Sequence, residues 1–317
     1  MYFQSHKSSE PRMDPSPNIT FIICTYNRAE YLDDTLHSLL QQPVENIVTE
    51  LLVVNNNSTD NTPEVVAKHR EQADPSAFRI SYFEEAEQGL SFARNRGIRE
   101  AASEHIVFVD DDIRAEQHFI ENWINFFETY PNYHAAGGQI RVQFDDHKPK
   151  WASHYLLSLF GYHNLGKKVR EYPGNKYPFG GNMGFRKELF EETGLFDTDL
   201  GRKGDQLTAN EEKDLFNRVK SLGEPILYLP KALLYHRIGP ERATQDYIRK
   251  QAEGMGKSVA RQTKGSFKLK LTHVFKEIFK TAVSLGLFLI YLIGFTPAKG
   301  IMLLKFRYWI LRGYLTT

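Results

Sequence analysis

The chain has 317 residues, of which 41% are hydrophobic and 25% are charged. This is an ordinary globular composition, sufficient for one large domain or two small ones. The single cysteine, Cys24, excludes an intrachain disulfide and fits a reducing compartment. Because Cys24 follows an apolar run, we expect it to be a buried small residue and not a nucleophile.

The formal net charge of +1 conceals an asymmetry along the chain. Nine Lys or Arg residues and one acid follow residue 263, so this tail carries a charge of +8 and the rest of the chain −7. The basic tail is therefore physically distinct from the acidic body.

Residues 1–17 are polar and rich in proline, and we expect them to be disordered. The segment Met1-Tyr2-Phe3-Gln4-Ser5 resembles the remnant of a protease-recognition sequence. No secretory signal peptide opens the chain, so we expect a cytoplasmic protein.

Strand and helix patterns alternate from residue 19 to residue 130. Apolar runs predict strands at residues 19–24, 50–54, 79–83 and 106–109. Helical spacing and capping residues predict helices at residues 29–40, from about residue 62, at 89–102 and at 117–130. This alternation predicts an α/β fold with a mostly parallel sheet that helices cover on both faces.

The middle of the chain is less regular. A predicted strand at residues 135–144 precedes long loops over residues 145–177, with one helix near residues 151–160. A strand at 180–185, helices at 187–193 and 211–221, and a strand at 225–229 follow. Long loops in compact domains are usually functional, and four aromatic residues here suit either a stacking surface for a ligand or a core: Trp151, Tyr155, Tyr162 and Tyr177.

The tail, residues 266–317, is apolar as well as basic. Eighteen uncharged residues separate Lys280 from Lys299, a borderline length for a membrane-spanning helix, which needs about 20 apolar residues. Basic residues beside Trp, Tyr and Phe suit a membrane interface, so we expect the tail to lie on a membrane surface. The alternatives are helices packed on the body or on a second subunit of a homodimer.

Three consecutive carboxylates, Asp110-Asp111-Asp112, close an apolar run that has the pattern of a buried strand. Adjacent carboxylates repel, and their burial is costly unless a cation or hydrogen-bond donors compensate. Open α/β sheets bind ligands at the carboxyl ends of their strands. The triplet therefore indicates a divalent cation that holds a phosphate; the simpler alternative is an acidic turn that caps the next helix.

Other polar motifs occur in a fixed order along the chain: Thr25-Tyr26-Asn27-Arg28, Asn55-Asn56-Asn57, Arg94, Gly180-Gly181-Asn182, Glu211-Glu212-Lys213-Asp214 and His236. With these motifs, residues 19–236 resemble the inverting family 2 glycosyltransferases of the GT-A fold. The resemblance implies a nucleotide-diphosphate-sugar donor, a divalent metal (Mn²⁺ or Mg²⁺) and inversion at the anomeric carbon.

The resemblance assigns the nucleotide to the first two strand ends. Thr25 and Tyr26 would offer backbone groups and a ring face to the base, and Arg28 would pair with phosphate. Asn55 and Asn56 stand where the family usually has a carboxylate that accepts the uracil imide hydrogen. An amide oxygen can still accept this bond, and we expect the donor to be a UDP-sugar.

Four further residues match positions near the donor, and Asp111 lies among them. Arg94 matches the residue that reaches the base or phosphates, and Asp110 the residue that contacts the ribose. Asp111 lies between Asp110 and Asp112, and we place it on the donor side without an assigned contact. Gly181 and Asn182 resemble the loop beneath the donor sugar, where glycine permits close backbone approach and the amide can bind sugar hydroxyls.

The resemblance also implies the metal ligands and the catalytic base. Asp112 and His236 match the metal ligands, which stabilise the departing diphosphate. Inversion requires a base opposite the leaving group, and an acidic pair at a helix start supplies it in the family. We predict Glu212 as the base, with Glu211 and Asp214 as alternatives; the simpler reading is a solvated acidic helix turn.

The sequence thus predicts a metal-dependent inverting glycosyltransferase, a hexosyl- or N-acetylhexosaminyltransferase of cell-surface polysaccharide synthesis. Residues 18–265 would form the catalytic domain, and residues 266–317 would hold it at the inner membrane face, near a glycan or lipid-linked acceptor. We expect no nucleic-acid partner. One alternative, a sugar-phosphate nucleotidyltransferase, requires a Gly-rich loop that residues 25–28 lack. The other is a non-catalytic nucleotide-sugar-binding scaffold, against which the intact acidic motifs argue.

Overall fold

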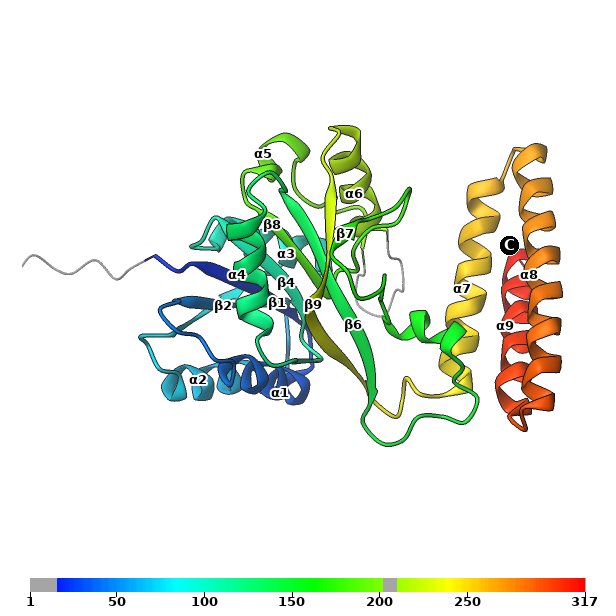
Figure 1. Cartoon of the computed structure of the whole chain (residues 1–317), viewed down its shortest axis with the longest axis horizontal. Coiled ribbons are helices and arrows are strands. Elements are labelled where there is room, and N and C mark those ends of the chain that lie inside the picture. Colours follow the sequence, from blue (N-terminus) through cyan, green and yellow to red (C-terminus); the bar gives the residue numbers. More distant parts are fainter. Residues whose placement is uncertain (1–15, 202–209, 317) are drawn as a thin grey trace, which may run out of the picture.

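The computed structural model describes residues 16–201 and 210–316, so the disorder predicted for residues 1–17 falls almost entirely outside the described residues. The strands are β1 (Ile19–Thr25), β2 (Thr49–Asn55), β3 (Phe78–Glu84), β4 (His105–Asp110), β5 (Ile113–Ala115), β6 (Ala135–Phe144), β7 (Arg170–Glu171), β8 (Asn182–Arg186) and β9 (Ile226–Ile238). Within the described residues they form one sheet in the order β3-β2-β1-β4-β8-β6-β9-β5, with β7 paired to β9 (Figure 1). The first four strands of this order are parallel, as predicted, while β8 runs antiparallel to both of its neighbours.

Helices cover both faces of the sheet. They are α1 (Ala29–Leu40), α2 (Thr62–Gln72), α3 (Leu90–Glu100), α4 (Phe119–Thr129), the 3₁₀ helix η1 (His154–Phe160), α5 (Leu189–Thr193), α6 (Glu211–Ser221), α7 (Gln245–Thr263), α8 (Phe267–Ile293) and α9 (Pro297–Leu315). The core on one face contains residues of α1, α2 and α4, and the core on the other face contains residues of α3, α5 and α6. The predicted two-faced α/β architecture is therefore confirmed.

The central strands have nearly continuous apolar sequences because both of their faces are buried. On β4, Val107 and Val109 contribute to one core, whereas Ile106 and Phe108 contribute to the other. The parallel register aligns Thr25 with Asn55 and Cys24 with Asp110. The polar motifs after these strands consequently meet at one edge of the sheet.

The structure differs from the prediction around two strands. The acidic triplet does not cap a helix, because the short strand β5 follows it and pairs with β9, with Ile113 opposite His236. The strand predicted at residues 225–229 continues to Ile238. Its register against β6 shifts between Leu229 and Leu233, and this bulge accommodates Pro230, which has no N–H to donate to a ladder.

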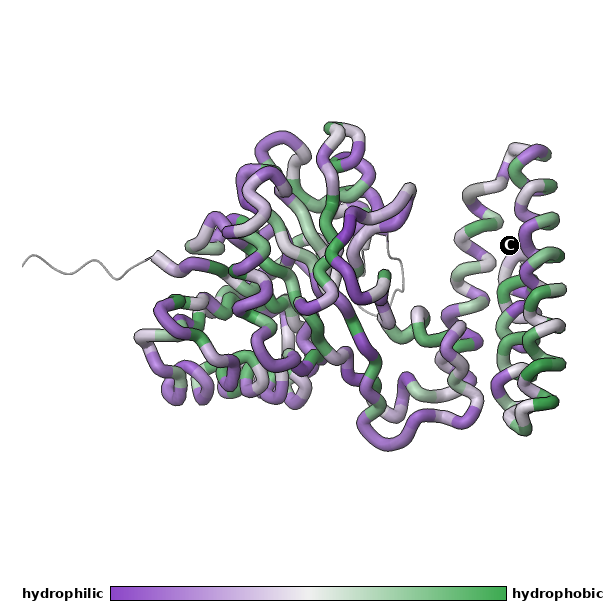
Figure 2. Tube along the Cα trace, viewed as in Figure 1, coloured by the Kyte–Doolittle hydropathy of each residue, from purple (hydrophilic) through white to green (hydrophobic). Residues whose placement is uncertain are grey.

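The three C-terminal helices stand side by side at one end of the molecule (Figure 1). Helix α7 packs closely on α9, because a Cβ atom on Gly256 would lie 2.1 Å from the carbonyl oxygen of Ile310. A third core joins these helices to the body and includes Phe160 of η1 and Phe306 of α9. Apolar residues recur along much of α8 and α9 (Figure 2). Within residues 16–201 and 210–316, no helix combines the length and the apolar character needed to span a bilayer.

Candidate active site

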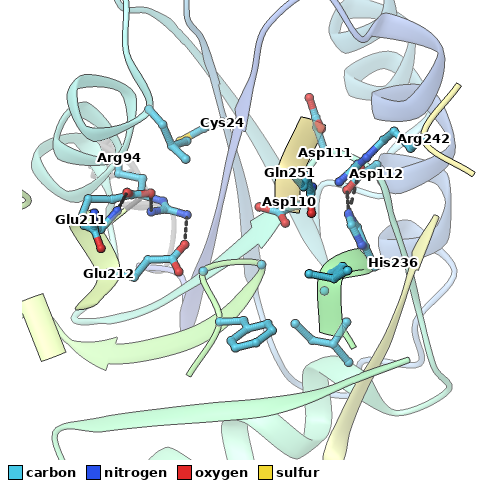
Figure 3. Close-up of a pocket in the computed structure, with 18 of the residues that line it drawn as sticks. Cys24, Arg94, Asp110, Asp111, Asp112, Glu211, Glu212, His236, Arg242 and Gln251 are labelled. Carbon is cyan, nitrogen blue, oxygen red and sulfur yellow. Dashed lines mark hydrogen bonds and ion pairs between the residues drawn. The ribbon is translucent and has the colours of Figure 1, made fainter. Parts of the chain in front are cut away.

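A cavity of about 1090 Å³ opens at the carboxyl ends of β1 and β4 and extends to α7. Most of the predicted site residues line it: Thr25, Tyr26, Arg28, Asn56, Arg94, Asp110, Asp111, Asp112, Gly181, Glu211, Glu212 and His236. Figure 3 shows the acidic pair of α6 with Arg94 on one side of the cavity and the acidic triplet with His236 on the other.

Hydrogen-bond donors compensate the charges of the acidic triplet. Asp112 is 1% exposed, and its Oδ2 accepts hydrogen bonds from Arg28 (2.7 Å) and from Arg242 (3.0 Å). Asp111 accepts from the hydroxyl of Thr25 and from Arg28, both at 2.8 Å. The two arginines therefore stabilise the buried carboxylates in this state of the protein.

The environment separates the pKa values of the two buried acids. Burial raises the pKa of Asp111 to about 6, although the Arg28 guanidinium lowers it. For Asp112, burial acts in the same direction, but His236, Arg28 and Arg242 together hold its pKa well below the usual range. Burial disfavours the charged form of His236, yet the carboxylate of Asp112 raises its pKa.

The donor set around His236 fits a divalent cation. Its Nδ1 lies 2.6 Å from the carbonyl oxygen of Phe160, so Nδ1 carries a proton and Nε2 points at Asp112, 3.0 Å from Oδ1. This Oδ1 atom is buried and, apart from the ion-pair contact with His236, receives no hydrogen bond from the described residues. Ligand atoms of Asp110, Asp112 and His236 all lie within 4.8 Å of one another. Two carboxylates and an imidazole oriented by a carbonyl group are suitable ligands for Mn²⁺ or Mg²⁺.

The acidic pair at the start of α6 is bound by one buried arginine. Arg94, which is 3% exposed, donates to Glu211 at 3.2 Å and to Glu212 at 3.0 Å. Glu211 is 2% exposed, so the alternative of a solvated acidic turn does not hold for it. Burial raises the pKa of Glu212; Arg94 opposes this shift, and Glu211 adds to it. A carboxylate with a raised pKa beside a cavity is suited to accept a proton.

Two consecutive glycines separate these groups. A Cβ atom on Gly180 would lie 1.8 Å from Oε1 of Glu212, and one on Gly181 would lie 2.4 Å from Oδ2 of Asp110. Any side chain at either position would occupy the space of a carboxylate. The backbone of Gly180 and Gly181 therefore approaches both acidic groups directly.

Three predicted site residues do not line the cavity. Asn55 donates to the hydroxyl of Tyr82 and accepts from the backbone N–H of Ser58. Asn182 is fully buried and donates to two carbonyl groups, on β6 and on β9. Asp214 pairs with Arg218 at 2.9 Å. Asn56 does line the cavity, but its amide holds the loop before α3 through Glu85, Glu87 and Gly89, so its polar atoms are already engaged.

Some cavity residues carry no signal in the sequence. Arg242 reaches Asp112 from the segment between β9 and α7, a long-range contact that no local pattern predicts. One face of α7, including Lys257 and Arg261, also lines the cavity. Cys24 is half-buried there, and burial raises its pKa to about 12, so its thiol stays protonated and is a poor nucleophile.

Comparison with known proteins places this geometry in a family. The sequence profile described as "Glycosyl transferase family 2" matches residues 20–194, more than half of the chain. The glucosyl-dolichyl phosphate glucuronosyltransferase of Haloferax volcanii is 25% identical over 235 residues, which are 73% of this chain and 72% of that protein. Glycosyltransferase GlyA of Streptococcus pneumoniae is 29% identical over 231 residues, 69% of this chain but only 30% of the longer relative.

Solved structures share the fold. The mannosyltransferase PcManGT from Pyrobaculum calidifontis, in complex with GDP-Man and Mn²⁺, superimposes with a TM-score of 0.59 at 17% identity and covers 95% of this chain and 87% of its own. GalNAc-T7 with UDP, GalNAc and Mn²⁺ gives a TM-score of 0.56 at 14% identity, over 82% of this chain and 55% of the other. At such identities the likeness concerns the fold, and it confirms the GT-A architecture predicted from the motifs.

Proposed function

This chain belongs to glycosyl transferase family 2, and on that premise we propose that it is a metal-dependent inverting enzyme. It transfers a sugar from a nucleotide-diphosphate donor, for which we propose a UDP-sugar, to a hydroxyl group of a glycan or lipid-linked acceptor in cell-surface polysaccharide synthesis. The family match argues against the alternative of a nucleotidyltransferase.

One observation carries the proposal: the arrangement of carboxylates around the cavity. Asp110, Asp112 and His236 form a cation-binding set on one side, while Glu212 lies on the other. Gly180 lies against Glu212 and Gly181 against Asp110, so neither position places a side chain between the two groups. A leaving group on one side of a sugar and a base on the other is the arrangement that inversion requires.

In the proposed reaction, Glu212 accepts the proton of the acceptor hydroxyl group. The acceptor oxygen forms a bond to the anomeric carbon as the bond from that carbon to the diphosphate oxygen breaks, so the configuration inverts. The divalent cation that Asp110, Asp112 and His236 would hold supplies Lewis acidity to the departing diphosphate. Arg94 orients Glu212, and burial keeps the Glu212 carboxylate basic enough for the task.

Two arginines and the first strand end are proposed to bind the donor. Arg28 and Arg242 already hold a carboxylate in the cavity and have the geometry to pair with phosphate oxygens. Tyr26 is 41% exposed and can stack on the base. Since the amide of Asn56 is engaged by its own loop, the backbone groups near Thr25 are the better candidates for reading the base.

The donor and the stereochemistry are tested together. A panel of UDP-, GDP- and dTDP-sugars should give Mn²⁺-dependent release of nucleoside diphosphate, with the highest rate for a UDP-sugar. The anomeric configuration of the product, read by NMR, should be opposite to that of the donor. A preference for GDP-sugars would refute the assignment of uracil as the nucleotide base of the donor. Retained configuration would refute the inverting mechanism.

We also propose that α8 and α9 lie on the inner membrane face, near a lipid-linked acceptor. Large apolar side chains on α8 are exposed, including Phe275 at 64% and Phe279 at 70%. Basic residues surround them, and the one acid, Glu277, is paired with Lys280 and Arg307. An apolar face with basic flanks suits anionic lipid, and the Haloferax volcanii relative is named for a dolichyl-phosphate-linked sugar.

Sedimentation with phosphatidylglycerol vesicles tests this membrane contact. The F275S/F279S variant should bind vesicles at least tenfold more weakly than the wild type, because two exposed phenyl rings no longer insert. Tyr155→Ser removes an aromatic residue of similar exposure outside these helices and is the matched control. If F275S/F279S binds vesicles as tightly as the wild type, and a dimer that the wild type forms in solution is lost in the variant, this face is a subunit interface instead.

A further inference from the structure

One face of α7 forms the wall of the cavity that faces the sheet edge. Lys250, Gly254, Lys257 and Arg261 line the cavity at spacings of four, three and four residues, which places them on one side of the helix. Three of these four residues are cations. The acids that line the same cavity all come from the acidic triplet and from the start of α6.

Of the three cations on this face, Lys250 pairs with Asp246 at 3.1 Å, and the other two are Lys257 and Arg261. The two acids of α7 are engaged elsewhere, because Asp246 pairs with residues one turn along its own helix and Glu253 pairs with Arg312 of α9. Among the described residues, neither Lys257 nor Arg261 forms an ion pair, and both are exposed. A cavity wall with two uncompensated cations attracts an anionic group.

The glycine on this face has no packing role. A Cβ atom on Gly254 would meet nothing within 4 Å, whereas one on Gly256 would meet the backbone of α9 at 2.1 Å. Glycine inside a helix costs about 1 kcal/mol relative to alanine, so an unpacked glycine is expected where space is needed for something else. Met255, which is 46% exposed, and Val259 add apolar surface to the same wall.

We propose that this face of α7 is an acceptor subsite that binds the phosphate group of a phosphorylated acceptor, with Lys257 and Arg261 as its ligands and Gly254 as the opening for the attached chain. The inference rests on the proposed transferase function and adds the chemical class of the acceptor. The subsite lines the same cavity as Glu212, so the acceptor hydroxyl group can reach Glu212 while the phosphate stays on α7. Because α7 packs on α9, a lipid chain attached to the phosphate would lead toward the apolar helices.

Isothermal titration calorimetry tests the subsite on the whole protein with UDP and Mn²⁺ in excess, so that the donor side is filled. Geranyl phosphate, glucose 1-phosphate and geraniol are the probes. At least one phosphate should bind, and K257Q/R261Q should weaken this binding at least tenfold. Tighter binding of geranyl phosphate identifies a lipid phosphate, tighter binding of glucose 1-phosphate identifies a soluble one, and either outcome supports the subsite.

Matched variants separate the subsite from general effects. R99Q/K231Q removes two exposed cations outside the cavity and should leave phosphate binding unchanged. Gly254→Leu fills the opening and should also abolish binding, whereas Gly286→Leu makes the same change at an equally unpacked glycine of α8 and should not.

Three results would overturn the proposal. K257Q/R261Q could bind both phosphates as tightly as the wild type, or geraniol could bind as tightly as geranyl phosphate. In the third result, K257Q/R261Q loses affinity for UDP together with affinity for the phosphates, which would assign the cations to the donor. Failure of the proposed function looks different, because the wild-type protein would then bind no nucleoside diphosphate when UDP is titrated in the presence of Mn²⁺ alone.

Discussion

Replacing Glu212 by glutamine tests the proposed base most directly. The Gln carbonyl oxygen can still accept the 3.0 Å hydrogen bond from Arg94, so the pairing of Arg94 with Glu211 should survive. The substitution preserves volume and removes only the ability to accept a proton. General-base catalysis contributes about 10²- to 10⁴-fold to a rate, so we expect kcat to fall by this factor, or about 3 to 5 kcal/mol in activation free energy.

The assay measures release of nucleoside diphosphate at saturating donor and acceptor, with the Kd of the nucleotide determined separately. The Kd should change little, because Glu212 acts on the acceptor hydroxyl group. Asp214→Asn is the matched control: Asp214 lies on the same first turn of α6 but pairs with Arg218 outside the cavity. A kcat of E212Q within tenfold of the wild type would refute the role of Glu212, and a large loss in D214N alone would move the base to Asp214.

Four further predictions follow from the same contacts. Because Glu212 must be ionised to accept a proton and burial raises its pKa, kcat should fall as the pH falls through that raised pKa; the pH–rate profile of E212Q should lack this acidic limb. Gly180→Ala places a methyl group within 1.8 Å of the Glu212 carboxylate and should lower kcat at least tenfold while circular dichroism stays unchanged. Asp112→Asn should weaken Mn²⁺ binding at least tenfold in an electron paramagnetic resonance titration, because a neutral amide replaces a charged ligand. Gly254→Ala should raise the free energy of unfolding by about 0.4–1 kcal/mol. Gly256→Ala should lower it by about 1–3 kcal/mol, because the added methyl group meets the α9 backbone. Equal shifts of the two variants in a denaturant titration would contradict the helix packing described above.

Local patterns predicted the framework of the protein well. The strands of the first half have short apolar runs because both of their faces are buried, and the helices between them show apolar spacing because only one face is buried. The polar motifs follow the strand ends directly, so their order along the chain already placed them at one edge of the sheet. The family and the GT-A fold came from the resemblance that these motifs carry, and both are confirmed.

The prediction of strands failed where strand pairing joins residues that are far apart in the sequence. Strand β5 has three residues, too few for a pattern, and it exists because β9 offers an edge beside it. The bulge around Pro230 extends β9 to His236 and brings that side chain to Asp112. Neither feature is visible in a window of neighbouring residues.

The sequence by itself determined which chemical groups the chain carries: the triplet at the end of β4, the acidic pair at the start of α6 and the basic, apolar tail. Residue type and spacing express these properties locally. Only the tertiary structure decided which groups face one another. It turned Asn55 and Asn182 toward the scaffold, added Arg242 to Asp112, and brought the cations of α7 to the same cavity as Glu212. The physical reason is that side-chain partners in a folded chain are fixed by the register of strands and the packing of helices, which depend on residues far apart in the sequence.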